Sequence, residues 1–388
     1  MNFSLDEGQL ALKDAVRKYC DGEISINDRA LENNEEFQGK CWKGLAELGI
    51  LGLTVNEEYG GSGLSLIDAV LVVEELGRAM ISRHYIESIL VCAKLIDKLG
   101  SIEQKKSVIP ELSSGKRKCS LVLGEGFNNS SNGSLVIAKK VNDGWLLSGV
   151  KNRILDPGSD GYLLIIAQEF NEECETECLK GFIVEASKLS SSIRFGSMAD
   201  GNRSIDIEFK NIIVKDSEII TLGKNGSVNL CAIKEQLNEC QIAFSAASMG
   251  GLLVAFEQTV SYLKDRKQFG RRVIDFQVVQ HSLANFYIAL EQLRSTIHLA
   301  AQTAVKGEAA EINRLVAALH VLTVDTLYQF SELSIQLHGA MGMTEECLVG
   351  RYARILVASA QRMSRATHSL KTFGALSLPT TVGIKGGE

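Results

Sequence analysis

Proline is almost absent from this chain of 388 residues. Its three prolines are Pro110, Pro157 and Pro379, so the stretch from Gly158 to Leu378 contains none. Proline removes a backbone donor and clashes with the preceding helical turn, and its absence therefore permits long uninterrupted helices. A chain of this length predicts two to three domains with a large buried core.

The composition excludes several classes of protein and partner. With 23% charged and 45% hydrophobic residues, the chain is neither disordered nor collagen-like. A net charge of -6 gives no broad basic surface for nucleic acid or an anionic membrane. The sequence shows no apolar run of about 18 residues and no signal peptide at its start. Nine scattered cysteines predict reduced thiols, so we expect a cytoplasmic protein. The charge and the lack of a long apolar run predict no nucleic-acid or membrane partner.

The spacing of apolar residues divides the chain into regions of different predicted secondary structure. Residues 1–118 predict an N-terminal helical domain, and residues 229–375 predict a C-terminal helical bundle. In the bundle, apolar residues keep a three-four spacing for several turns, which is typical of a helix packed lengthwise on its neighbours. The residues with that spacing are Phe276, Val279, Leu283, Phe286, Leu290, Leu293 and Ile297. Residues 376–388 are expected to form a flexible tail.

Residues 119–228 predict a β domain instead. Short runs of β-branched and aliphatic residues follow one another closely, and Asn142-Asp143-Gly144 is a hairpin turn signal between two of them. Because the connections are short, an antiparallel sheet or barrel is favoured over a parallel sheet with helical crossovers.

Several catalytic classes leave no trace in the sequence. The six histidines show no metal-ligand spacing, so we predict no metal site. Neither a hydrolase G-x-S-x-G motif nor a P-loop is present. Gly124-Glu125-Gly126 lacks the third glycine and the helix of a dinucleotide-binding turn.

Two stretches carry candidate chemistry. Residues 265–281 hold four cations, an aromatic residue and an amide within seven positions, a set that suits a pyrophosphate with a flat ring beside it. Residues 336–346 hold small residues that permit close approach of a backbone or ligand. Taken singly, the first stretch favours a solvated basic loop between helices, and the second favours a helix C-cap followed by a turn.

Together these stretches resemble the acyl-CoA dehydrogenase family. Phrases near the N-terminus agree, namely Trp42 to Leu53, Glu57 to Gly61 and Glu74 to Arg78. The resemblance covers nearly the whole chain. It implies a mainly α fold with a central β domain: an N-terminal helical domain, an antiparallel β-barrel and a C-terminal four-helix bundle.

The resemblance also implies a cofactor, a substrate and a redox partner. Family members bind FAD at a subunit interface, remove hydrogen from an acyl-CoA with the help of a glutamate base, and pass electrons to an electron-transfer flavoprotein. One subunit holds the flavin ring, and its neighbour supplies an arm to the pyrophosphate and adenosine. The positions of this chain that match the arm are Arg266, Gln268, Phe269, Phe276, Gln277, Gln336, Gly339 and Ala340, the last replacing a glycine.

The flavin-holding side departs from the family pattern. Its [ST]-E-P-x-x-G-S-D loop reads Gly124 to Ser131 here, and its W-I-T tripeptide reads Arg153-Ile154-Leu155. The position of the usual catalytic glutamate is Met363, and the known alternative position is Cys240. Glu239 is the nearest carboxylate to that alternative, but one step on a helix turns a side chain by about 100°, so it is a weak candidate for the base.

The arm residues match the family, whereas the flavin-holding motifs differ and the catalytic glutamate is missing. This combination suggests that two different subunits share the functions of one dehydrogenase. The pattern resembles the small subunit of pimeloyl-CoA dehydrogenase and the partner subunits of steroid side-chain acyl-CoA dehydrogenases. We therefore expect an α2β2 complex in which this chain completes the FAD site of a paralogous catalytic subunit. Two alternatives stay open: a self-sufficient homomeric dehydrogenase with a displaced base such as Glu239, and a flavin-free scaffold of the same fold.

Overall fold

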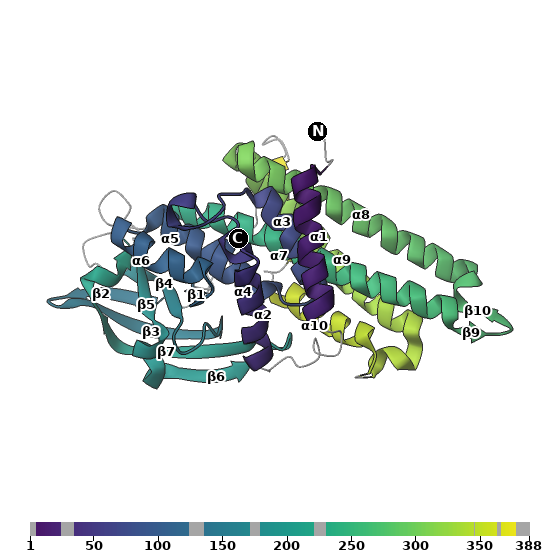
Figure 1. Ribbon diagram of the computed structural model, residues 1–388, viewed down its shortest axis with the longest axis horizontal. Coiled ribbons are helices and arrows are strands. Elements are labelled where there is room, and N and C mark those ends of the chain that lie inside the picture. The colour runs from purple at the N-terminus through teal and green to yellow at the C-terminus, as the bar shows by residue number, and fades with distance from the viewer. Residues whose placement is uncertain are drawn as a thin grey trace, which may run out of the picture. The chain divides into compact units, whose positions relative to one another are not determined.

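The computed structural model describes residues 5–24, 35–123, 136–170, 179–220, 230–344, 346–362 and 366–377. The chain forms two compact units, Ser4–Ala247 and Ser248–Glu388, and the long helix α7 (Leu230–Asp265) belongs to both (Figure 1). Each unit is described by itself. The three domains predicted from the texture of the sequence stay a prediction.

Helices open the first unit. The buried helix α3 is apolar on most of its surface, and Gly77 lets it approach the backbone of α7 closely: a Cβ there would lie 2.2 Å from the carbonyl oxygen of Ala247. Capping boxes begin several of these helices, as at Asp6 and Ser101. The elements are α1 (Glu7–Glu23), α2 (Glu35–Glu47), α3 (Leu66–Arg78), α4 (Ser82–Tyr85), the π-helical η4 (Ile86–Ala93), α5 (Lys94–Leu99) and α6 (Ile102–Ser113).

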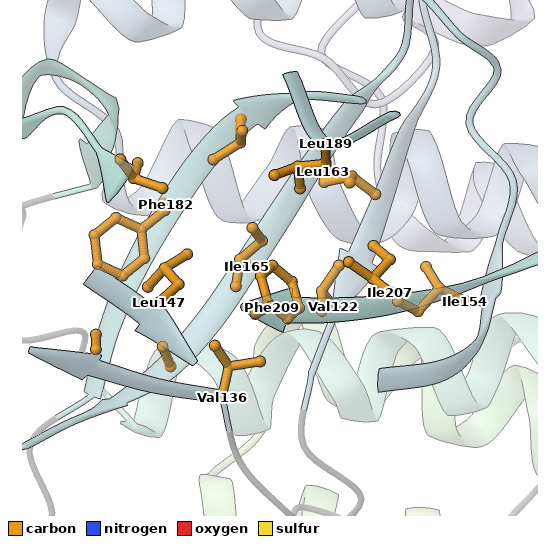
Figure 2. Close-up of a cluster of buried hydrophobic side chains, with 14 of the residues drawn as sticks. Val122, Val136, Leu147, Ile154, Leu163, Ile165, Phe182, Leu189, Ile207 and Phe209 are labelled. Carbon is orange, nitrogen blue, oxygen red and sulfur yellow. The ribbon is translucent and has the colours of Figure 1, made fainter. Parts of the chain in front are cut away.

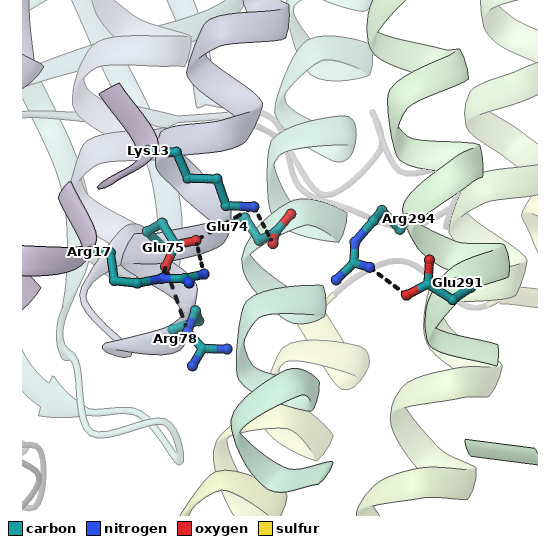
Figure 3. A network of polar contacts seen from close by, with 7 residues as sticks. All are labelled: Lys13, Arg17, Glu74, Glu75, Arg78, Glu291 and Arg294. Carbon is teal, nitrogen blue, oxygen red and sulfur yellow. Dashed lines mark hydrogen bonds and ion pairs between the residues drawn. The ribbon is translucent and has the colours of Figure 1, made fainter. Parts of the chain in front are cut away.

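A buried ion-pair network fastens α1 to α3 (Figure 3). The carboxylate of Glu75 is 1% exposed and accepts two hydrogen bonds from Arg17, at 2.8 and 3.0 Å. The ammonium of Lys13 lies 3.0 Å from Glu74 and 3.6 Å from Glu75, and Arg78 approaches Glu75 to 3.6 Å. The acidic pair of α3 therefore serves as an anchor for the N-terminal helix.

The middle of the chain forms an eight-stranded sheet with the strand order β6-β7-β3-β2-β4-β5-β8, and β1 also pairs with β4. Five of the pairings are antiparallel, as expected. The strands are β1 (Cys119–Val122), β2 (Val136–Val141), β3 (Gly144–Leu155), β4 (Tyr162–Glu169), β5 (Leu179–Glu185), β6 (Ile193–Ser197), β7 (Arg203–Val214) and β8 (Ile219–Ile220).

Two pairings are parallel, which the sequence did not predict. β1 pairs with the first half of β4, from Tyr162 to Ile165, and β2 pairs with the second half, from Ala167 to Glu169. Since β5 pairs along β4 from Tyr162 to Gln168, both strands must lie on the other edge of β4. β1 and β2 therefore lie one after the other along the same edge of β4.

Alternate side chains of these strands form one hydrophobic core (Figure 2). Phe182 and Trp145 meet edge to face, with ring centroids 6.0 Å apart. Besides Phe182, the figure labels Val122, Val136, Leu147, Ile154, Leu163, Ile165, Ile207 and Phe209 of the strands, and Leu189 of the short helix η6 (Ala186–Ser192).

The second unit is mainly helical, and no proline interrupts its described helices. The predicted apolar stripe of α8 is buried from Val279 to Ile297, and Phe286 stacks on Phe330 of α9 at a centroid distance of 4.3 Å. After α7 come β9 (Lys267–Gln268), β10 (Arg271–Arg272), η9 (Val273–Asp275), α8 (Gln277–Lys306), α9 (Ala309–His338), η10 (Gly339–Met343), α10 (Leu348–Arg362) and α11 (Ala366–Ser377).

One expectation about apolar runs was wrong. Cys231–Asp265 of α7 contains an 18-residue window that is long and apolar enough to cross a membrane, and 61% of that window is buried inside the protein. A buried core helix passes the same test, because its apolar residues face other parts of the protein on several sides.

Candidate functional site: an exposed cationic arm

A tight hairpin presents the most exposed aromatic residue of the basic stretch. β9 and β10 pair through Gln268 and Arg271, which leaves Phe269 and Gly270 as the turn. Both have positive φ, 54° and 78°, as a type I′ turn requires. Phe269 is 91% exposed. The left-handed conformation costs a residue with a side chain about 1–2 kcal/mol, and such strain clusters where function needs it.

The four cations of this segment have different surroundings. Arg272 donates to both carboxylate oxygens of Asp275, at 3.2 and 2.9 Å, and this guanidinium lowers the pKa of Asp275. Arg271 lies over the ring of Phe276, 4.0 Å from its centroid. The side chains of Arg266 and Lys267 meet no hydrogen-bond or ion-pair partner within the described ranges. Two cations are therefore available for an anionic ligand, and a third is held on an aromatic face.

The end of α9 lies beside this hairpin. His338 stacks on Tyr262 with centroids 4.5 Å apart, and Leu337 packs into the cluster that contains Phe276. Gly339 follows with φ 62° and ψ −142°, a conformation that favours glycine. The C-terminal end of α9 is thereby placed next to η9 and the start of α8.

The structure thus brings together the two stretches singled out in the sequence. All the predicted arm residues lie at this end of the second unit, in or next to the hairpin, at or just before the start of α8, at the end of α9 or in η10, and most are exposed to solvent. They are Arg266, Gln268, Phe269, Phe276, Gln277, Gln336, Gly339 and Ala340. We call this set, with Lys267 and Arg271, the arm.

The predicted set left out two members of the arm, Lys267 and Arg271, although both belong to the four cations counted in the sequence. Arg271 lies over the ring of Phe276 and pairs with Gln268 across the hairpin, so it shares the face of this predicted arm residue. The signal was available, because a two-residue turn places the residues on either side of it directly opposite each other.

The weak candidate for the catalytic base is occupied elsewhere. The carboxylate of Glu239 lies 2.7 Å from the ammonium of Lys94 and accepts a hydrogen bond of 3.1 Å from Gln236. Burial raises the pKa of the neighbouring Cys240 to about 12, so its thiol stays protonated at neutral pH. Met363, at the other position considered for the base, lies outside the described residues.

The flavin-holding side can be followed only in part. The loop from Gly124 to Ser131 lies outside the described residues. Arg153 is exposed, has φ 59° and donates its backbone N–H to Asp206 at 2.8 Å, whereas Leu155 is buried. A solvent-facing cation therefore lies at the position of the family's tryptophan.

Comparisons with known proteins show the family of the chain. The acyl-CoA dehydrogenase N-terminal domain matches residues 6–116, and the C-terminal domain matches residues 230–360. The isobutyryl-CoA dehydrogenase of Dictyostelium discoideum is 30% identical over 331 residues, which cover 84% of this chain and 78% of that protein.

Two solved structures share the fold over almost their full length. A chain of the ChsE4-ChsE5 complex of Mycobacterium tuberculosis superposes with a TM-score of 0.84 at 21% identity, covering 98% of this chain and 100% of that one. The glutaryl-CoA dehydrogenase of Mycobacterium smegmatis in complex with FADH2 gives 0.83 at 19% identity, covering 96% and 95%. With both helical regions matched and a relative at this identity, the chain belongs to the acyl-CoA dehydrogenase family of oxidoreductases.

Proposed function

We propose that this chain is one subunit of a heteromeric, FAD-dependent acyl-CoA dehydrogenase, in which its arm completes the FAD site of a paralogous catalytic subunit. The observation that carries the proposal is the arm itself. Phe269 is 91% exposed in a strained conformation, and it lies beside Arg266 and Lys267, which pair with no carboxylate of the described residues. Such a surface is unfavourable in an isolated chain and suits an interface with an anionic, aromatic ligand.

The chemistry of the arm fits the pyrophosphate and adenosine of FAD. Guanidinium groups bind phosphate oxygens in pairs, and Arg266 and Arg271 offer two of them. The exposed amides of Gln268, Gln277 and Gln336 can both donate and accept hydrogen bonds, as an adenine or ribose requires. Bound FAD would accept the hydride that leaves the acyl group; this chain's contribution is to hold the non-reacting end of the cofactor.

A heteromer is favoured over a homomer by what the chain lacks. Glu239 is engaged by Lys94, Cys240 stays protonated, and Arg153 lies where relatives carry a tryptophan. The comparison with the ChsE4-ChsE5 complex supports an assembly of two different chains. We propose the stoichiometry α2β2, with half the flavins of a homotetramer.

Flavin stoichiometry tests the proposal. The chain is purified alone and after co-expression with a paralogous dehydrogenase subunit, and FAD per chain is measured by absorbance together with acyl-CoA oxidation. We expect a colourless isolated chain and a yellow, active complex with about one FAD per αβ pair. One FAD per isolated chain with unaided activity would favour the homomeric alternative. A colourless product with every partner would favour a flavin-free scaffold.

Arm variants test the assignment of residues. Arg266→Met removes a charge-assisted contact worth about 1.5–3 kcal/mol, and the complex should lose FAD about 10- to 100-fold more readily. Arg272→Met is the matched control in the same hairpin, because Asp275 already engages that guanidinium. Equal effects of both variants would argue against direct contact of Arg266 with phosphate.

Three finer expectations belong to the same proposal. The electron acceptor is an electron-transfer flavoprotein, the acyl group is bulky or dicarboxylic, and the complex is cytoplasmic. Dye-linked assays with a panel of acyl-CoA thioesters test the acyl group, reduction of purified electron-transfer flavoprotein tests the acceptor, and cell fractionation tests the location.

A further inference from the structure

The three most exposed large apolar side chains among the described residues all lie at the arm end of the second unit. Phe269 is 91% exposed, Met343 76% and Val278 73%. Phe269 belongs to the arm, whereas Val278 and the two exposed methionines of η10, Met341 and Met343, do not. Single exposed apolar side chains are ordinary on a soluble protein, but a group of them marks an interaction site.

Packing fixes the position of these side chains beside the arm. Val278 is the second residue of α8 and lies two positions after Phe276. The turn η10 folds back on the last turn of α9 so closely that a Cβ at Gly342 would lie 2.9 Å from the carbonyl oxygen of Ile335. Leu337 of that turn belongs to the same apolar cluster as Phe276. The start of α8 and η10 therefore share one end of the unit.

Binding of FAD accounts for the polar residues of the arm but not for Val278 and the two methionines. Neither an aliphatic side chain nor a thioether can donate a hydrogen bond to a phosphate oxygen. Methionine is unbranched and polarizable, so it adapts to irregular apolar surfaces and is frequent at protein-binding sites. An apolar centre with the cations Arg266 and Lys267 at its edge has the composition of a protein interface, which combines a dry centre with a polar rim.

We propose that Val278, Met341 and Met343 form an apolar contact with the protein surface of the paralogous catalytic subunit. This contact rests on the proposed function, because a subunit whose FAD reaches the arm must itself lie against this end of the unit. Two tasks are then carried by different residues: the arm holds the cofactor, and the apolar contact holds the subunit. The complex should therefore assemble without FAD.

Methionine oxidation tests the contact on the unmodified chain. The isolated chain and the complex, with FAD and after its removal, are treated with dilute hydrogen peroxide, which transfers one oxygen atom to an accessible thioether and leaves water. Peptide mass spectrometry gives the rate at each methionine. We expect Met341 and Met343 to be oxidised about tenfold more slowly in both forms of the complex than in the isolated chain. Met198, half-buried in the first unit, is the control and should react at one rate throughout.

Charge substitutions test the same contact by affinity. Val278→Asp and Met343→Asp each place a carboxylate in the apolar contact and should weaken association with the paralogous subunit at least about tenfold, with or without FAD. Leu370→Asp is the matched control, because Leu370 is 57% exposed in the same unit. Its neighbour Ser369 bonds His320, about five helical turns before the end of α9, so Leu370 lies far from the arm.

Arg266→Met should show the opposite behaviour, with FAD lost more readily and the subunits still associated. Methionines that stay reactive in the complex, or that are protected only while FAD is bound, overturn the contact and leave the proposed function intact. Equal association of Val278→Asp and Leu370→Asp does the same. Failure of the unchanged chain to associate with any paralogous subunit overturns both.

Discussion

The anchor between α1 and α3 gives the sharpest test of the energetics. Glu75 is buried and receives a two-point contact from Arg17, while Lys13 and Arg78 lie farther away, each at 3.6 Å. Arg17→Met removes the two shortest contacts and leaves the carboxylate with two weaker partners. A hydrogen bond to a charged group contributes about 1.5–3 kcal/mol. Because the side chain of Arg17 is 43% exposed, we expect a loss of about 2 kcal/mol.

Glu75→Gln should cost more, since it leaves Lys13, Arg17 and Arg78 around a neutral amide. Removing one partner of a buried network costs about 3–5 kcal/mol, and we expect the lower value because two of the cations reach solvent. The double variant Arg17→Met/Glu75→Gln combines the two single substitutions and removes both charges of the pair. Its cost should fall short of the sum of the single variants by about 2 kcal/mol.

Native-state hydrogen exchange measures these losses locally, because α1 can separate from α3 without global unfolding. At 1.4 kcal/mol per tenfold, amides of α1 should exchange about 30-fold faster in Arg17→Met and about 150-fold faster in Glu75→Gln. Glu291→Gln is the control. Its partner Arg294 lies one turn away on α8, the pair is about one-third exposed (Figure 3), and such pairs contribute under about 0.5 kcal/mol. Additive single variants, or unchanged exchange in α1, would refute the reasoning.

Three further predictions concern the glycine contact, the arm and the acid limb of stability. Gly77→Ala forces a Cβ against the carbonyl oxygen of Ala247 and should lower the free energy of unfolding by about 3 kcal/mol, as measured by urea titration. Gly22→Ala is the control, because the space around Gly22 is open. Phe269→Gly should raise the stability of the isolated chain by about 1 kcal/mol, because it relieves a left-handed conformation, yet lower FAD retention in the complex; a loss of stability would contradict this. Hydrogen bonds from Lys116 and then Tyr162 lower the pKa of Glu111. The contribution of Glu111 to the free energy of unfolding is therefore present above about pH 4.5 and is lost as pH falls through the lower folded pKa. Glu111→Gln should be less stable than the parent at pH 7 and should show a shallower fall in melting temperature between about pH 5 and 3.

Local patterns predicted the elements well where one period dominates. The three-four spacing of α8 and the turn at Asn142-Asp143 follow from residues a few positions apart, and both are present in the structure. The parallel pairing of β1 and β2 with β4 could not be predicted, because register between distant strands depends on packing of the whole sheet. The apolar character of α7 was underestimated because single polar residues interrupt its runs.

The candidate site was also predictable where local patterns determine it, and not where distant contacts do. Motif spacing identified most of the arm, and hairpin geometry supplied Arg271. The strain at Phe269 was beyond the sequence, because the φ of a turn residue is set by the pairing of its flanking strands. The engagement of Glu239 by Lys94 was equally hidden, since the two residues are 145 positions apart.

The shared edge of β4 has a consequence for how this chain can change over evolutionary time. Since β1 and β2 are aligned by separate stretches of β4, the residues between them are not needed to set the register of any described pair. That interval contains the departures from the family's flavin loop. Substitutions, deletions or whole-loop grafts there should leave the sheet intact. Cofactor binding can therefore change during evolution without loss of the fold. The same interval is where a loop from a catalytic relative could be transplanted to ask whether flavin binding returns.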